Sequence, residues 1–202
     1  LSEMSFSDFH EKFKPYIKNI SRLKLALGML YAAKTVFDVD RLYALANHIR
    51  CREKLSGSAD AVLKKFTDKI YSAKGFRASA KIIGDTRKKL KSIETDKNKE
   101  VLKVAVIGEI FITCEPFTNL DIERKLGNLG IEVTNTMSAG LWIKEHFIHK
   151  LLPFKSKISS HDAAKEFIHT DDIGGHGIDT VGNAVLYSKY GYDGIIHLYP
   201  FT

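Results

Sequence analysis

The stretch Val101-Leu102-Lys103-Val104-Ala105-Val106-Ile107-Gly108 decides the fold. It is an almost continuous apolar run, as expected of a strand that is buried on both faces of a parallel sheet. Residues 119–129 then show the apolar spacing of a short amphipathic helix, and Gly130 ends it. A second strand begins at residues 131–133. This order predicts a parallel βαβ unit with a right-handed crossover.

The rest of the second half continues this alternation of helices and strands. The expected elements are helices over residues 141–152, 162–169 and 178–190 and an apolar strand over residues 195–202. Three strands are fewer than the usual sheet of about five or six. We therefore expect the α/β domain to be incomplete at its C-terminal end and the chain to be a fragment.

The first half has a helical pattern throughout. Helices are expected over residues 6–17, 23–49, 58–71 and 77–93. The polar stretch 94–100 is expected to be a linker. The sequence thus predicts an α/β protein with an N-terminal helical segment over residues 1–97. A partial, parallel, Rossmann-like three-layer domain is expected over residues 98–202, truncated at its C-terminal end.

Charge is shared unevenly between the two halves. Residues 1–100 carry 22 Lys and Arg against 12 Asp and Glu, whereas residues 101–202 carry 9 against 12. The lysines are interleaved with acids and no aromatic–basic recognition pattern appears, so we expect a solvated helical face and no nucleic-acid partner. No apolar run approaches the roughly 20 residues of a membrane span, so no membrane partner is expected.

Two features point to possible binding chemistry. Glu109 directly follows the first strand, where it could act as a ligand or acid–base group or could cap nearby backbone N–H groups. The run Gly174-Gly175-His176-Gly177 precedes a helix, and its N–H groups could cradle an anion, although a purely structural turn is the alternative. These five residues are the candidate cofactor-binding site.

Other candidate residues carry weaker signals. Cys114 is expected near a helix N-terminus, where a thiol pKa can fall, but a buried and inert thiol is the favoured interpretation. Thr118 or Asn119 is expected to cap the following helix. His146 and His149 are three residues apart, yet no third ligand is evident, so neither a metal site nor a catalytic residue is predicted. With Cys51 the only other cysteine, no disulfide framework is expected, and we place the chain in the reducing cytoplasm.

Four ordered blocks of sequence resemble a known family. They are Val106–Ile110 with Glu115–Phe117, Asn119, Ile122–Gly127 and Gly130–Val133; Leu141–Lys144; Gly174–Gly177 with Thr180–Gly182; and Gly191 with Asp193–Leu198 and Pro200–Thr202. Together they look like relatives of the D component of 2-hydroxyglutaryl-CoA dehydratase, also described as CoA-substrate-specific enzyme activase or activator proteins. The helical half is similar more loosely, around Ile49, Arg50, Glu53 and Gly57.

The resemblance implies oxygen-sensitive iron–sulfur chemistry in the full-length protein. An ATP-dependent activase would deliver low-potential electrons to a cysteine-ligated cluster. A CoA thioester is a further implied partner. Relatives continue from Pro-Phe-Thr into Cys-Met-Pro and carry an earlier Gly-Cys-Gly-Pro-Cys segment. We therefore expect the cluster ligands outside this chain, no cofactor within it, and a fragment that is inactive alone.

Two functions follow as hypotheses. In the first, the chain is part of an iron–sulfur activator or 2-hydroxyacyl-CoA dehydratase-like component, so that the parent protein is a lyase or an ATP-dependent reductase component. In the second, it is a non-catalytic docking or regulatory module whose basic helical half binds the activase or another acidic partner.

Overall fold

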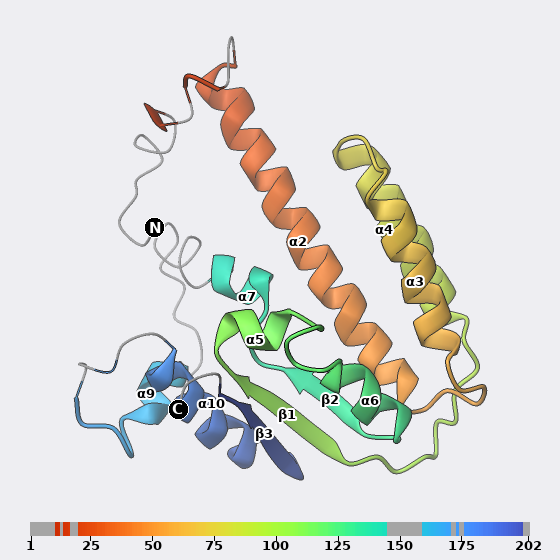
Figure 1. Ribbon diagram of the computed structural model, residues 1–202, viewed down its shortest axis with the longest axis vertical. Coiled ribbons are helices and arrows are strands. Elements are labelled where there is room, and N and C mark those ends of the chain that lie inside the picture. The colour runs from red at the N-terminus through yellow and green to blue at the C-terminus, as the bar shows by residue number, and fades with distance from the viewer. Residues whose placement is uncertain are drawn as a thin grey trace.

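The computed structural model describes residues 11–12, 14–16, 20–144, 159–170, 173 and 176–199. Within these ranges the chain forms eight helices and three strands, and it is a mixed α/β protein. Figure 1 shows the small sheet near the C-terminal end of one long helix and a helical hairpin beside that helix. None of the helices in these ranges is both long and apolar enough to cross a membrane.

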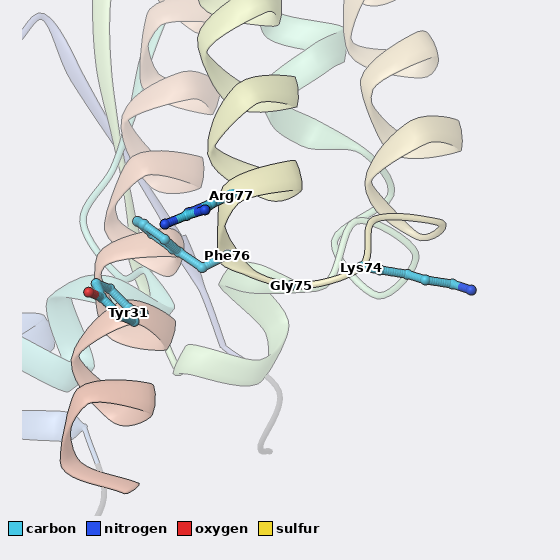
Figure 2. A pocket seen from close by; sticks show the side chains of 5 residues that line it. All are labelled: Tyr31, Lys74, Gly75, Phe76 and Arg77. Atoms are coloured by element: carbon cyan, nitrogen blue, oxygen red, sulfur yellow. The ribbon is translucent and has the colours of Figure 1, made fainter. Parts of the chain in front are cut away.

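The N-terminal part consists of α2 (Arg22–Arg50), α3 (Ser58–Ile70) and α4 (Phe76–Lys91). These helices confirm the predictions over residues 23–49, 58–71 and 77–93. The predicted helix over residues 6–17 lies mostly outside the described residues. Tyr31 of α2 stacks on Phe76 at the start of α4, with ring centroids 4.5 Å apart (Figure 2).

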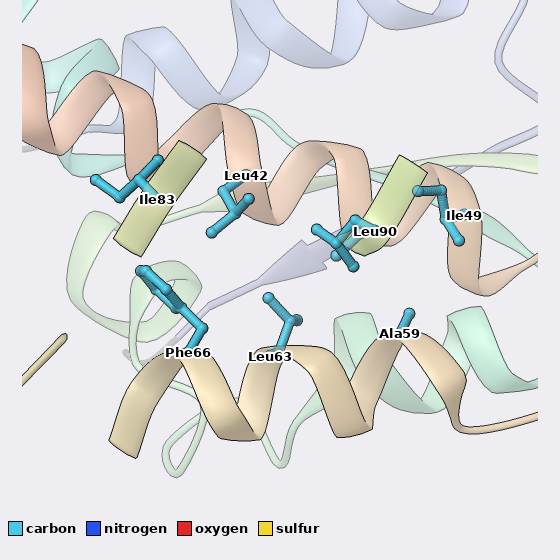
Figure 3. Close-up of a cluster of buried hydrophobic side chains, with 8 residues drawn as sticks. Leu42, Ile49, Ala59, Leu63, Phe66, Ile83 and Leu90 are labelled. Carbon is cyan, nitrogen blue, oxygen red and sulfur yellow. The ribbon is translucent and has the colours of Figure 1, made fainter. Parts of the chain in front are cut away.

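A cluster of buried side chains holds the three helices together. Each helix contributes apolar residues that meet between them (Figure 3). The cluster consists of Leu42, Ala46, Ile49, Ala59, Leu63, Phe66, Ile83 and Leu90. Because these positions recur at helical spacing on α3 and α4, burying one face of each helix removes them from water and stabilises the hairpin against α2.

The loop between α2 and α3 is fixed by hydrogen bonds. The Glu53 carboxylate accepts from the backbone N–H groups of Gly57 and Ala59, at 2.5 and 2.8 Å, and so caps α3. Gly57 has φ of +86°, which glycine adopts readily. The polar stretch predicted as a linker is attached here, because the backbone N–H of Lys54 donates to Glu94.

The sheet contains β1 (Lys103–Gly108), β2 (Glu132–Asn135) and β3 (Gly194–Leu198) in the order β2-β1-β3. Both neighbours of β1 run parallel to it, which confirms the predicted parallel βαβ unit. Five of the six residues of β1 are buried, as the apolar run required. In β3, by contrast, partly buried and exposed positions alternate, so one face of this strand is open to solvent.

The α/β part also contains five helices: α5 (Ile110–Cys114), α6 (Ile122–Asn128), α7 (Ala139–Ile143), α9 (Ser160–Ala164) and the longer α10 (Gly177–Lys189). The prediction over residues 178–190 is confirmed by α10. The helix predicted over residues 119–129 starts later, because Leu120 and Asp121 have positive φ. The helix predicted over 162–169 is the shorter α9, and most of the one predicted over 141–152 lies outside the described residues.

Candidate functional site

The carboxyl end of β1 meets the carboxyl end of β3. After β1 the chain turns toward β2, while β3 lies on the other side of β1. In open parallel sheets, ligands bind where neighbouring strands send their chains in opposite directions. Gly108, the last residue of β1, pairs with Leu198, and a Cβ at this position would overlap the Leu198 carbonyl oxygen. Glycine therefore allows the two strand ends to approach closely.

Glu109 lies directly after this strand end and caps α5. Its Oε2 accepts hydrogen bonds from the backbone N–H groups of Phe111, at 2.8 Å, and Ile112, at 3.2 Å. The side chain is half-buried at the sheet edge. Glu109 thus performs the capping role weighed from the sequence. Neither of these bonds uses its second oxygen, Oε1.

The N-terminus of α10 lies at the same edge of the sheet as Gly108. The turn after α10 is attached to the beginning of β1, because Asp193 and Lys103 exchange two hydrogen bonds of 2.8 and 2.9 Å. With its end at the amino edge and a length of about 20 Å, α10 must begin near the carboxyl edge. His176, directly before α10, is half-buried, and its carbonyl accepts from the hydroxyl of Thr180.

The glycine-rich turn is only partly described. Gly174 and Gly175 lie outside the described residues, whereas His176 and Gly177 are at the start of α10. A Cβ on Gly177 would come within 2.6 Å of Ile173, so glycine also lets the chain turn tightly here. The structure therefore brings Glu109, His176 and Gly177 to one edge of the sheet.

A close crossing of α9 and α10 fixes this edge. A Cβ at Gly182 would overlap the backbone of Ser160, so only glycine allows the two helices to approach this closely. The Ser160 hydroxyl also donates to Asp179 in the first turn of α10, at 2.7 Å. Gly182 belongs to the third block of the resemblance, and the sequence alone gave it no role.

Cys114 differs from its prediction in two ways. It ends α5 instead of lying near a helix N-terminus, and the residue as a whole is exposed, whereas the prediction favoured a buried one. The thiol donates to the Met137 carbonyl, and desolvation raises its pKa above the usual value. Asn119 has the predicted capping role, since its side chain accepts from the N–H groups of Asp121 and Ile122.

Neither cysteine of the chain belongs to a metal-binding group in the part of the chain that is described. Across those residues, no three His, Cys, Asp or Glu side chains are placed to hold a metal ion. Cys51 is buried, and burial raises the pKa of its thiol. His146 and His149 lie outside the described residues.

Sequence reasoning missed a buried polar network that joins the two parts of the molecule. Arg50, at the end of α2, donates to Asp60 of α3 at 2.8 Å and to Asn47 at 2.5 Å. Asn47 donates to Glu123 of α6, which also accepts from Asn135 of β2 at 2.8 Å. A signal existed in the sequence, because charged and amide side chains interrupt the apolar pattern at the end of α2.

A second polar cluster ties α2 to the start of β2. Glu132 accepts from Arg52 at 2.6 Å and lies 2.8 Å from Nδ1 of His48. Burial alone would raise the pKa of Glu132, but the hydrogen bonds from His48 and Arg52 outweigh it and lower that pKa. Asp40, two turns earlier in α2 than His48, accepts from the Ser138 hydroxyl at 2.6 Å and so holds the start of α7.

A shallow pocket of about 440 Å³ lies where α2 meets the start of α4. It is lined by the stacked rings of Tyr31 and Phe76, with Lys74, Gly75 and Arg77 around them. Figure 2 shows the Lys74 side chain pointing away from the two rings. The charged ends of Lys74 and Arg77 therefore do not converge on one ligand, and we assign no binding role to this pocket.

Comparison of the chain with models of known protein families, with curated proteins and with solved structures finds no match in any of the three.

Proposed function

We propose that this chain is the helical segment and part of a larger Rossmann-like domain from an iron–sulfur activator or 2-hydroxyacyl-CoA dehydratase-like component. In this proposal the component acts in the cytoplasm with an ATP-dependent activase, which supplies low-potential electrons. The edge of the sheet between β1 and β3 faces the cofactor and a CoA thioester. Glu109, His176 and Gly177 border that edge, and the proposal assigns binding to the whole run Gly174–Gly177.

One observation carries the proposal. Three blocks that resemble the family, although far apart in the sequence, end at the same carboxyl edge of the sheet. Gly108 ends β1 and Glu109 follows it, His176 caps α10 and Gly177 begins it, and Leu198 ends β3. If the family shares a binding site, the sequence blocks that its members have in common should meet at such an edge.

The open face of β3 supports the view that the domain is larger. Ile195 and Tyr199, at alternate positions, are 37% and 67% exposed. Among the described residues, β3 pairs with β1 on one side only. Exposed apolar side chains on an edge strand favour burial against further structure.

The residues of this chain do not form a ligand set for a cluster. Four thiolates hold the common iron–sulfur clusters, whereas the chain has two cysteines, which lie on different elements. We therefore derive no step through the cluster, and the proposal assigns its ligands to cysteines outside this sequence. The role left to this chain is to border the site and to orient what binds there.

The proposal is tested with a longer form of the protein that extends beyond both ends of this sequence. Purified without oxygen, it should be brown, contain iron and sulfide, and be reduced by the activase only when ATP is hydrolysed. A matched variant with serine in place of the first cysteine after residue 202 should lose iron. A colourless, iron-free protein would contradict the proposal.

A further inference from the structure

A groove of about 520 Å³ runs between α3 and α4. Its residues recur at the spacing of one helical face on each side. They are Val62, Lys65, Phe66 and Lys69 on α3 and Ile82, Asp85, Thr86, Lys88 and Lys89 on α4. Figure 1 shows this hairpin on the side of α2 away from α9 and α10, so the groove is separate from the sheet edge and its role does not depend on the proposed function.

The floor of the groove is apolar. Phe66 is 3% exposed, and Val62 and Ile82 are partly buried against the same core that holds the three helices. Thr86 is also buried, and its hydroxyl donates to the Ile82 carbonyl at 2.7 Å. The floor therefore offers apolar surface and no free hydroxyl to a ligand.

The rim of the groove is positively charged. Lys65, Lys69, Lys88 and Lys89 are all exposed, and Asp85 is the one acidic residue among them. None of these four lysines forms an ion pair with any residue that the structure describes, whereas lysines elsewhere do, such as Lys54 with Glu94. The rim thus presents unneutralised positive charge around an apolar surface.

We propose that this groove binds an acidic amphipathic helix of a partner protein. Helices bind in grooves through apolar side chains about one turn apart. Val62 and Ile82, which are only partly buried, supply the matching apolar surface. Asp and Glu side chains flanking that apolar stripe would pair with the lysines on both sides. Residues 1–100 carry 22 basic against 12 acidic residues. The positive electrostatic potential of the whole helical half therefore also favours an acidic partner.

The same features disfavour a single-stranded nucleic acid in this groove. Bases bind such grooves by stacking on exposed aromatic rings. Phe66, the aromatic residue that lines the groove, is buried and closed to stacking. Val62 and Ile82 would be left facing a phosphate backbone, which gains nothing from apolar surface.

The test uses the 202-residue chain and a fluorescein-labelled helical peptide of about 15 residues, with leucines on one face and glutamates beside them. Fluorescence anisotropy should show saturable binding that weakens between about 50 and 500 mM salt. The double variant Lys65→Glu, Lys88→Glu should weaken binding at least about tenfold. The matched double variant Lys64→Glu, Lys91→Glu changes the net charge equally on the same two helices and should change binding less than about twofold.

Three results would overturn the proposal. One is equal weakening by the two double variants, which would show a general charge effect. Another is equal binding of a peptide in which lysines replace the glutamates. The third is displacement of the peptide by single-stranded RNA that loses affinity in the same groove variant. Circular dichroism of both variants should match that of the parent chain.

Discussion

At the scale of single residues, Arg50 contacts groups from three helices. Its guanidinium bonds Asp60 and Asn47, and its alkyl stem covers Gly127, where a Cβ would collide with it. It is 6% exposed, so removing it leaves the buried Asn47 Oδ1 without its donor and the Asp60 carboxylate without its cation. The sequence resemblance pointed to Arg50, but only the structure shows that it connects α2, α3 and α6.

We expect Arg50→Ala to lower the free energy of unfolding by about 3 kcal/mol, because Asn47 and Asp60 lose a buried partner. Urea denaturation measures this change. Arg124→Ala is the matched control, since Arg124 pairs with Asp121 on the surface and about half of its side chain is exposed. This control should cost less than about 1 kcal/mol. Equal losses in the two variants would show that the buried network contributes no more to the free energy of unfolding than an exposed ion pair does.

Two glycines in helices should respond in opposite ways. Gly182→Ala forces a Cβ against the Ser160 backbone and should cost about 1–3 kcal/mol. Gly28→Ala, in the open middle of α2, should stabilise by about 0.5–1 kcal/mol, because alanine is the better helix former and nothing lies within 4 Å. Thermal unfolding compares them, and a stabilising Gly182→Ala would disprove the close helix crossing.

At the scale of elements, the spacing of apolar residues predicted the type of most helices and strands. The continuous apolar run gave β1, and the regular spacing gave α2, α3, α4 and α10. Boundaries failed where local hydrogen bonds decided them. Asp121 adopts positive φ before α6, and Asn119 caps that helix from three residues earlier, which no apolar pattern reveals.

Contacts between elements could not be predicted from periodicity. The helical and α/β parts are joined through Asp40 and Asn47 of α2 and through Arg52, which follows it. Each of the three is bonded to a group remote in sequence. A single sequence shows that these residues are polar but does not show their partners. The candidate site could be predicted in part from the sequence. A carboxylate after a strand and glycines before a helix follow the general rule that sites form at the carboxyl ends of parallel strands.

The hydrogen bonds of Glu132 with His48 and Arg52 should make stability depend on pH. The pKa of Glu132 is below its ordinary value of 4.5 in the folded state, so its contribution is present above pH 4.5 and is lost as pH falls through the lowered value. Glu132→Gln should destabilise by about 1–2 kcal/mol at neutral pH. Chemical denaturation at several pH values should show this difference shrinking toward pH 3, and a constant difference would contradict the assignment.

At the scale of the whole molecule, the two surfaces proposed for binding are at separate places. The lysine-rimmed groove lies on the helical hairpin, and the candidate cofactor edge lies where β1, β3 and the start of α10 meet (Figure 1). The polar network around Arg50 connects the parts that carry them. A partner bound to the hairpin could therefore contact this protein without covering the sheet edge.

The central claim is that the end of β3 and the start of α10 reach the same edge of the sheet. The most direct test is a spin-label distance between Ile173→Cys and Tyr199→Cys, with Cys51→Ala and Cys114→Ser to remove the native thiols. Labels at one edge should lie closer than about 20 Å, the length of α10. A single distance of about 30 Å or more would place them on opposite sides and contradict the account.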